Sequence, residues 1–163
     1  TADLDKMTDS GKMGMVLLMV IGGSPGSTAG GMKTTTAAVL FAMAISVFRK
    51  NEQAHLYNRR IAEETQRNAA TIFVLYMMLF TGSAMFISYL EKVPLVTAFF
   101  ETGSAIGTVG LSLGLTPTLC LASRLVLICL MFFGRVGGLT LIFATVSGKR
   151  TEYKYPQEKI NVG

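Results

Sequence analysis

Charge is scarce in this chain of 163 residues. Charged residues make up 15% of it, well below the roughly 25% usual for soluble domains. Hydrophobic residues make up 50%. Between Met13 and Phe48 the only charged residue is Lys33. This composition argues against a water-soluble domain and indicates an integral membrane protein.

Residues typical of catalytic and metal sites are also few. His55 is the single histidine, and no metal-ligand spacing surrounds it. Cys120 and Cys129 fall in one predicted helix, about 13 Å apart at 1.5 Å per residue, whereas a disulfide needs Cα atoms within about 7 Å. We therefore expect core thiols. No nucleophile–base arrangement is visible, so we predict no enzyme and no covalently bound cofactor.

Acidic residues are fewer than basic ones, 10 against 15, for a formal net charge of +5. Basic patches are typical of nucleic-acid binding, but here the basic residues cluster at 49–68 and 147–163, beside apolar runs. The positive-inside rule accounts for that placement. Both segments are predicted to be cytoplasmic and the acidic N-terminus external, and no nucleic-acid partner is expected.

The apolar runs define the expected helices. Residues 69–90 and 119–146 are long enough to cross a bilayer, which takes about 20 residues. Residues 94–107 are apolar but too short to cross, as expected of a re-entrant segment. A full crossing there would place the linker 49–68 and the tail 147–163 on opposite sides of the membrane. The charge distribution therefore favours the re-entrant interpretation.

A Gly-, Ser- and Thr-rich interruption at 22–32 divides the apolar stretch 12–48. That stretch is nearly twice the length of one crossing, but each flank is shorter than the roughly 20 residues of a spanning helix. We favour one broken helix over a helical hairpin. Non-helical backbone at membrane depth must be covered by protein or line a cavity. The break is therefore either a gate or a packing loop.

The same break nearly matches the phosphate-binding pattern G-x-x-x-x-G-K-[ST]. Gly26 and Gly31 have the required spacing, but Met32 intervenes before Lys33. No β-α-β pattern surrounds the loop, and no carboxylate follows an apolar strand to hold magnesium. Nucleotide binding by residues 22–36 is therefore disfavoured.

Residues 101–118 are rich in glycine and nearly free of charge. Thr108-Val109-Gly110 matches the start of the T-V-G-Y-G loops whose carbonyls replace the hydration shell of potassium. Glycine tolerates positive φ, which lets successive carbonyls point the same way. The carbonyl end of the preceding helix carries partial negative charge and favours a cation. We predict a cation filter here; the alternative is a Gly-rich extracellular loop.

Two charged residues are expected within the membrane. Arg135 lies too deep in the 119–146 helix to snorkel easily, and such a residue is by default a functional hypothesis. Its expected partners are carbonyls or hydroxyls of residues 22–36, as part of a gate or as a structural clamp. Glu101 either braces the filter from behind through hydrogen bonds or reaches the outer water.

Several motifs together resemble one known family. Residues 21–36, 104–117, 133–141 and 155–163 are similar, in order, to segments of the Trk/Ktr/HKT cation transporters. The resemblance covers essentially the whole chain, and the short C-terminus is similar to that of the bacterial Ktr membrane subunit. The chain also starts at Thr1 without a signal peptide, so we expect the C-terminal part of a longer protein.

The resemblance implies an all-α integral membrane fold with four helix–pore loop–helix repeats around one pore. Residues 1–48 would be the second helix of the third repeat, broken at 22–32. Residues 69–146 would be the fourth repeat. They would be joined by the cytoplasmic linker 49–68 and followed by the cytoplasmic tail 147–163. The protein would be multi-pass in the cell's inner (plasma) membrane.

The resemblance also implies the site residues. The fourth filter segment would be Thr108, Val109, Gly110 and Leu111, with potassium held by the backbone carbonyls of the first three and Glu101 as support. Leu111-Ser112 in place of Tyr-Gly suggests fewer or looser ion sites than in a tetrameric channel. The gate beneath would comprise Gly22, Gly23, Ser24, Gly26, Ser27, Thr28, Gly30, Gly31, Lys33 and Arg135.

The implied function is potassium uptake across the cell membrane, passive or coupled to sodium. The expected partners are the remaining repeats of the same protein, a second copy in a homodimer, a cytosolic nucleotide-binding regulatory ring and membrane lipids. The three other filter segments are absent, so selectivity between potassium and sodium is not determined by this sequence. The alternative from another class is a non-conducting structural or assembly subunit.

Overall fold

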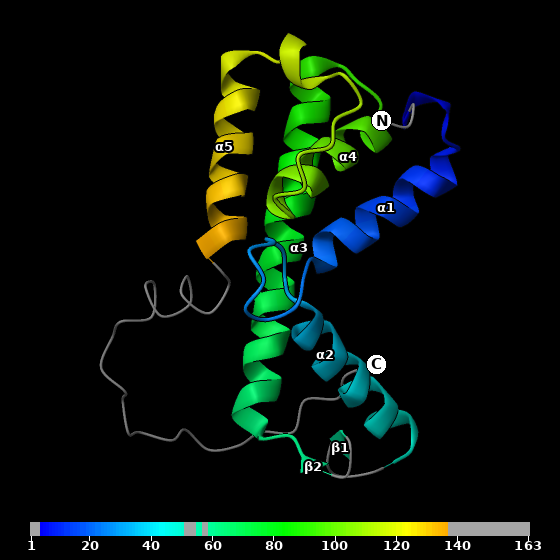
Figure 1. Ribbon diagram of the computed structural model, residues 1–163, viewed down its shortest axis with the longest axis vertical. Coiled ribbons are helices and arrows are strands. Elements are labelled where there is room, and N and C mark those ends of the chain that lie inside the picture. The colour runs from blue at the N-terminus through cyan, green and yellow to red at the C-terminus, as the bar shows by residue number, and fades with distance from the viewer. Residues whose placement is uncertain (1–3, 51–54, 57–58, 137–163) are drawn as a thin grey trace.

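The computed structural model describes residues 4–50, 55–56 and 59–136, which are mostly α-helical (Figure 1). This confirms the expected all-α class. The helices are α1 (Asp9–Ile21), α2 (Thr34–Phe48), α3 (Glu63–Glu91), α4 (Leu95–Ile106) and α5 (Leu121–Val136). Short 3-10 turns lie at Leu4–Lys6 and Thr116–Thr118, and β1 (His55–Leu56) pairs antiparallel with β2 (Arg59–Arg60).

The long helix α3 runs the length of the molecule (Figure 1). Its 29 residues extend about 43 Å at 1.5 Å per residue, against roughly 30 Å for the hydrocarbon core of a bilayer. Among the described residues, it alone is long and apolar enough to cross a membrane. It begins at Glu63, inside the predicted linker, because Glu63 and Glu64 in the first turn complement the helix dipole. The helix therefore begins six residues before the predicted span 69–90.

α1 and α2 lie on either side of the Gly-rich segment 22–33, here called the loop. α1 descends to the loop and α2 continues downward from it, so the chain does not turn back as a hairpin (Figure 1). The ends of the loop are tied together, because the amides of Met32 and Thr34 donate to the carbonyls of Val20 and Gly23, each at 3.1 Å. α1 begins at Asp9, earlier than the apolar stretch predicted, with the Thr8 hydroxyl as its N-cap.

The short helix α4 lies at the centre of the core, in contact with α1, α3 and α5. Its residues from Phe100 to Ile106 are all buried. The rings of Phe80 and Phe99 pack 5.1 Å apart where α3 meets α4. Tyr76 and Ile87 of α3 are also almost completely buried against this core. The polar segment that follows α4 is therefore held by a well-packed element.

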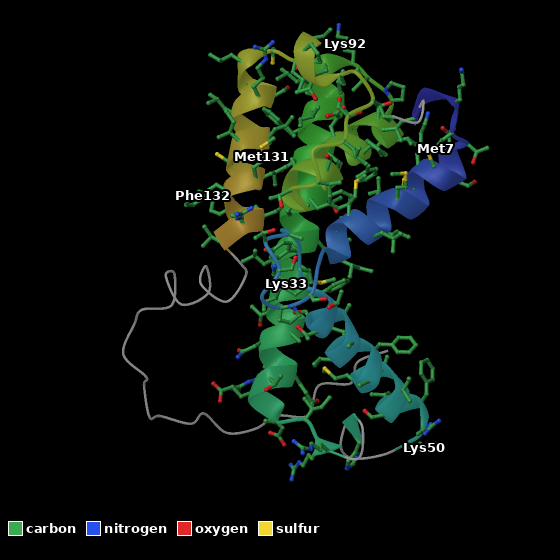
Figure 2. The ribbon with its side chains drawn as sticks, viewed as in Figure 1. Met7, Lys33, Lys50, Lys92, Met131 and Phe132 are labelled. Carbon is green, nitrogen blue, oxygen red and sulfur yellow. The ribbon has the colours of Figure 1, made fainter. Side chains whose placement is uncertain are left out.

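Large apolar side chains also cover the outside of the described helices. Leu18, Met78 and Phe132 are 70%, 73% and 62% exposed, and Figure 2 shows Phe132 pointing away from α5. Cys120 and Cys129 are exposed as well, so the prediction of core thiols is wrong for this part of the chain. A helix face that meets lipid or another apolar segment has the same apolar composition as one that meets the core. Composition alone therefore did not show that these two cysteines are exposed.

α5 begins at Leu121, after a 3-10 turn that contains Pro117. The predicted span 119–146 therefore starts two residues late in the structure, and its part from 137 onward lies outside the described residues. The tail 147–163 does as well.

Candidate functional site

The site is built around the C-terminal end of α4. At 12 residues, this helix extends about 18 Å at 1.5 Å per residue, too short to cross a bilayer core of roughly 30 Å. The chain folds back over the last turn through amide-to-carbonyl bonds: Gly107 to Gly103, Thr108 to Ala105 and Val109 to Ser104, at 2.9, 3.1 and 2.9 Å. These bonds satisfy carbonyls that a helix end otherwise leaves unpaired.

The candidate filter segment, residues 108–111, has an unusual backbone. Thr108 has φ +52° and Gly110 has φ +81°, in the left-handed region that L residues rarely adopt. A Cβ on Gly110 would meet no atom within 4 Å. Glycine is therefore favoured there by the backbone angle rather than by crowding. Val109 is 45% exposed, whereas Leu111 packs partly against the core.

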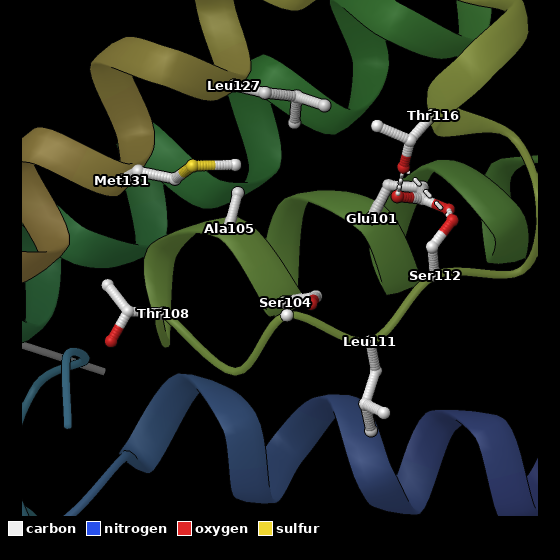
Figure 3. A pocket seen from close by; sticks show the side chains of 10 residues that line it. Glu101, Ser104, Ala105, Thr108, Leu111, Ser112, Thr116, Leu127 and Met131 are labelled. Carbon is white, nitrogen blue, oxygen red and sulfur yellow. Dashed lines mark hydrogen bonds between the residues drawn. The ribbon is translucent and has the colours of Figure 1, made fainter. Parts of the chain in front are cut away.

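The segment after residues 108–111 is anchored by Glu101, which is only 3% exposed. Its carboxylate accepts hydrogen bonds from the Ser112 hydroxyl, from the Leu113 amide at 3.0 Å and from the Thr116 hydroxyl at 2.9 Å. Figure 3 shows the two hydroxyls converging on the carboxylate. The Glu101 side chain therefore points into the protein rather than to the outer water, and it braces residues 112–116. Reasoning from sequence missed Ser112 and Thr116, although a buried carboxylate requires nearby donors.

A cavity of about 360 Å³ lies between α4, the filter segment and α5 (Figure 3). Thr108, Gly110 and Leu111 contribute to one wall, and Leu127 and Met131 of α5 to another. The walls on the α5 side are apolar, and the polar side chains of Glu101, Ser112 and Thr116 also line the cavity. The candidate filter segment is thus supported by α4 and has open space on its α5 side.

The loop lies directly against the end of α4. The Gly30 amide donates a 2.8 Å hydrogen bond to the Thr108 hydroxyl, across 78 positions of sequence. A Cβ on Gly30 would lie 2.8 Å from the Ile106 carbonyl oxygen, and one on Gly134 of α5 only 2.0 Å from it. Glycine at these two positions lets the loop, α4 and α5 meet around one carbonyl. The family resemblance implied that residues 22–32 lie beneath residues 108–111, but it predicted neither the hydrogen bond between Gly30 and Thr108 nor the close approach of Gly134, which was not among the candidate residues.

The other predicted gate residues divide into two groups. Gly30 and Gly31 are buried, and Gly22 and Gly23 are partly so; Ser24, Gly26, Ser27 and Thr28 are exposed on the outer part of the loop. The Lys33 ammonium donates to two carbonyls of the loop itself. In the near-match to the phosphate-binding pattern Lys33 would contact phosphate, but here its ammonium is bonded to the loop instead.

Arg135 lies in the last described turn of α5 and is exposed. It makes no hydrogen bond or ion pair with any residue in the part of the chain that the structure describes. The predicted contact between Arg135 and carbonyls or hydroxyls of residues 22–36 is therefore not made there.

The fold and the site define an α-helical protein whose described part has one helix long and apolar enough to cross a membrane, and a short buried helix that ends against two Gly-rich segments. A profile of the TrkH family, described as a cation transport protein, matches residues 1–153. The chain belongs to the TrkH family.

Individual relatives agree with this assignment. The chain is 40% identical to the potassium/sodium uptake protein NtpJ of Enterococcus hirae, over 99% of the chain and 37% of that protein. It is 32% identical to the Ktr system potassium uptake protein D of Bacillus subtilis, over 100% of the chain and 36% of that protein. The corresponding protein B of Vibrio alginolyticus is 31% identical, with the same coverage.

The chain spans a little over a third of the length of these curated relatives. The predicted resemblance to Ktr-type membrane subunits is confirmed. These relatives are transport proteins and not enzymes, which agrees with the prediction from the sequence. The family is described by cation transport.

Proposed function

We propose that this chain forms part of the pathway of a potassium uptake protein, with residues 108–111 as one segment of its selectivity filter. The observation that carries the proposal is the short buried helix α4, which ends at a left-handed segment with Thr108 and Gly110 at positive φ. Relatives along the whole chain are named for potassium or potassium/sodium uptake. Sodium remains the alternative or coupled ion.

The physical basis is backbone coordination. The carbonyls of Thr108, Val109 and Gly110 would replace part of the hydration shell of potassium, and the carbonyl end of α4 adds partial negative charge that favours a cation. Glu101 holds the chain just beyond Leu111, which limits collapse of the segment. With Leu111-Ser112 in place of Tyr-Gly, only one glycine shapes this segment, and we expect fewer or looser ion sites than in a T-V-G-Y-G loop.

The loop is the proposed gate, together with Arg135. Its support is the position of the loop against the end of α4, where Gly30 is bonded to Thr108. An ion that leaves the filter beside Thr108 would meet the backbone of the loop in its path. Flux would then require the loop to move.

The assembled transporter is proposed to draw its other filter segments from further repeats of the same protein, so that residues 1–48 complete the third repeat and 69–146 form the fourth. It would be multi-pass in the plasma membrane, with residues 49–68 and 147–163 cytoplasmic. A homodimer and a cytosolic nucleotide-binding ring are the proposed protein partners, since two relatives are named as parts of Ktr systems.

The filter assignment is tested by Gly110→Ser, with Gly114→Ser as its control. Both glycines have φ +81° and open space at the Cβ position, so the two changes impose the same backbone strain, and only one lies in the filter. In cells that lack potassium uptake, Gly110→Ser should reduce the preference for potassium over sodium by roughly tenfold, the effect of about 1.4 kcal/mol, and Gly114→Ser should not. Equal ion preference in both variants would contradict the assignment. If the unaltered protein shows no potassium uptake in these cells, that result would support the alternative of a non-conducting structural or assembly subunit.

A further inference from the structure

Lys33 occupies a position that its own chemistry disfavours. It is the N-cap residue of α2, with φ +79° and no side-chain capping bond. Residues other than glycine rarely adopt such a backbone conformation. The N-terminus of a helix also carries partial positive charge, which disfavours a cation. Such local conflicts persist only where surrounding interactions determine them.

The compensating interactions lie within the loop. The Lys33 ammonium donates to the carbonyl oxygen of Ala29, in a short bond, and to that of Ser27 at 3.4 Å. Hydrogen bonds from a charged donor are stronger than neutral ones. Figure 2 shows Lys33 where the loop meets the start of α2. The ammonium therefore ties the outer part of the loop back to the start of α2.

One peptide unit connects Lys33 to the candidate filter. The carbonyl of Ala29 and the amide of Gly30 belong to the same planar peptide group. Its oxygen accepts from Lys33 on one side, and its N–H donates to the Thr108 hydroxyl at 2.8 Å on the other. Successive hydrogen bonds through one group polarise and strengthen each other. A chain of contacts thus runs from the ammonium through the loop to Thr108.

We propose that Lys33 is a positioning residue that locks the loop beneath the filter segment by holding the Ala29–Gly30 peptide unit toward Thr108. The lysine is a tethered cation that occupies carbonyl oxygens of the loop. Loss of its charge releases the peptide unit and lets the loop leave the end of α4. The effect on ion flux rests on the proposed function of the loop as a gate, whereas the effect on loop conformation does not.

The lock is tested by thiol labelling of the assembled transporter in membranes. Cys120 and Cys129 are replaced by serine because both are exposed, and Ala29→Cys places a reporter at a partly buried position of the loop without altering the carbonyl that Lys33 bonds. Lys33→Met keeps an unbranched side chain and removes the ammonium. With a water-soluble methanethiosulfonate reagent, Lys33→Met should raise the labelling rate at position 29 roughly tenfold or more, given the strength of a hydrogen bond to a charged group.

Lys92→Met is the matched control. Lys92 is also a lysine with left-handed backbone, at φ +54°, but it is exposed at the end of α3, far from the loop (Figure 2). Labelling at position 29 should be unchanged in this variant. Lys33→Arg keeps a cation and should keep labelling slow.

Lys33→Gly guards against misfolding, because glycine adopts the left-handed backbone without strain and still lacks the ammonium. It should label as fast as Lys33→Met. Labelling in both variants at the rate of the Lys92→Met control would overturn the proposal. Potassium uptake is measured in parallel. Faster labelling with unchanged uptake would support the lock and contradict the gate, so failure of the two ideas can be told apart.

Discussion

At the scale of single residues, Glu101 shows how a charge is accommodated inside the core. Burying an ionised carboxylate is costly unless it is hydrogen-bonded, and three donors from residues 112–116 surround this one. All three come from the chain that returns from the filter segment. The carboxylate therefore anchors residues 112–116, and its removal should loosen these residues before the rest of the core.

Glu101→Ala should destabilise the protein by about 3 kcal/mol, since it removes a charged acceptor of several hydrogen bonds. Glu101→Gln should cost about 1 kcal/mol, because the amide oxygen still accepts and the Thr116 hydroxyl can reverse its role and accept from the amide nitrogen. Thermal unfolding of the detergent-purified transporter measures the difference. Equal losses in the two variants would show that the hydrogen bonds to Glu101 contribute little.

Thr108 gives a second test at this scale. Thr108→Val keeps the shape of the side chain but leaves the buried Gly30 amide without its acceptor, at a cost of about 1–3 kcal/mol. Thr108→Ser retains the hydroxyl. Labelling of the loop in the Ala29→Cys background should be faster in the valine variant and near the original rate in the serine variant. Equal rates would remove the link between Thr108 and the loop.

Sequence reasoning reached some of these features and missed others for physical reasons. Glycine content and apolar run lengths are local signals, and they predicted a short helix before Gly110 and an interruption at 22–32. The hydrogen bond between Gly30 and Thr108 joins residues 78 positions apart, which no local pattern encodes. The start of α3 was missed because Glu63 and its polar neighbours favour helix although they are not apolar. Cys120 and Cys129 were misplaced because apolar composition does not tell which side of a helix faces the core.

At the scale of elements, the contact between α4 and α5 depends on the absence of a side chain. Gly134→Ala would place a Cβ 2.0 Å from the Ile106 carbonyl oxygen, so α5 must move. We expect a loss of about 2 kcal/mol, within the usual range for overpacking of a core. Gly82→Ala in α3 is the control, since its Cβ meets nothing within 4 Å, and alanine should stabilise the helix by up to about 1 kcal/mol. Thermal unfolding should separate the two variants in opposite directions.

The loop is the second element whose role is open to a direct test. Deletion of residues 26–31 removes much of the exposed part of the loop together with the buried Gly30 and Gly31, and with them the hydrogen bond between Gly30 and Thr108. Potassium uptake should be faster than in the unaltered transporter if the loop is a barrier, and Arg135→Ala should have the same direction of effect. Uptake equal to that of the unaltered protein would leave both the loop and Arg135 with a packing role.

At the scale of the whole molecule, the two ends differ in chemistry. Arg49, Lys50, Arg59 and Arg60 gather where α2 ends and the β1–β2 pair lies, whereas Lys92 lies at the far end of α3 (Figure 2). α3 is long enough to separate these ends by a bilayer, and its outward side chains are largely apolar, as Val74 and Met78 show. From the positive-inside rule we propose that the Arg-rich end lies in the cytoplasm.

That orientation is tested by a matched pair of lysines. Lys50 and Lys92 are both exposed and both have left-handed backbone, with φ +53° and +54°, so cysteine should be tolerated similarly at each. In a background without Cys120 and Cys129, a membrane-impermeant thiol reagent added to intact cells should label Lys92→Cys and not Lys50→Cys. Inside-out vesicles should give the reverse, because a charged reagent cannot cross the roughly 30 Å apolar core of the bilayer. Labelling of both positions from one side would mean that α3 does not cross the membrane, and the re-entrant interpretation of α4 would fall with it.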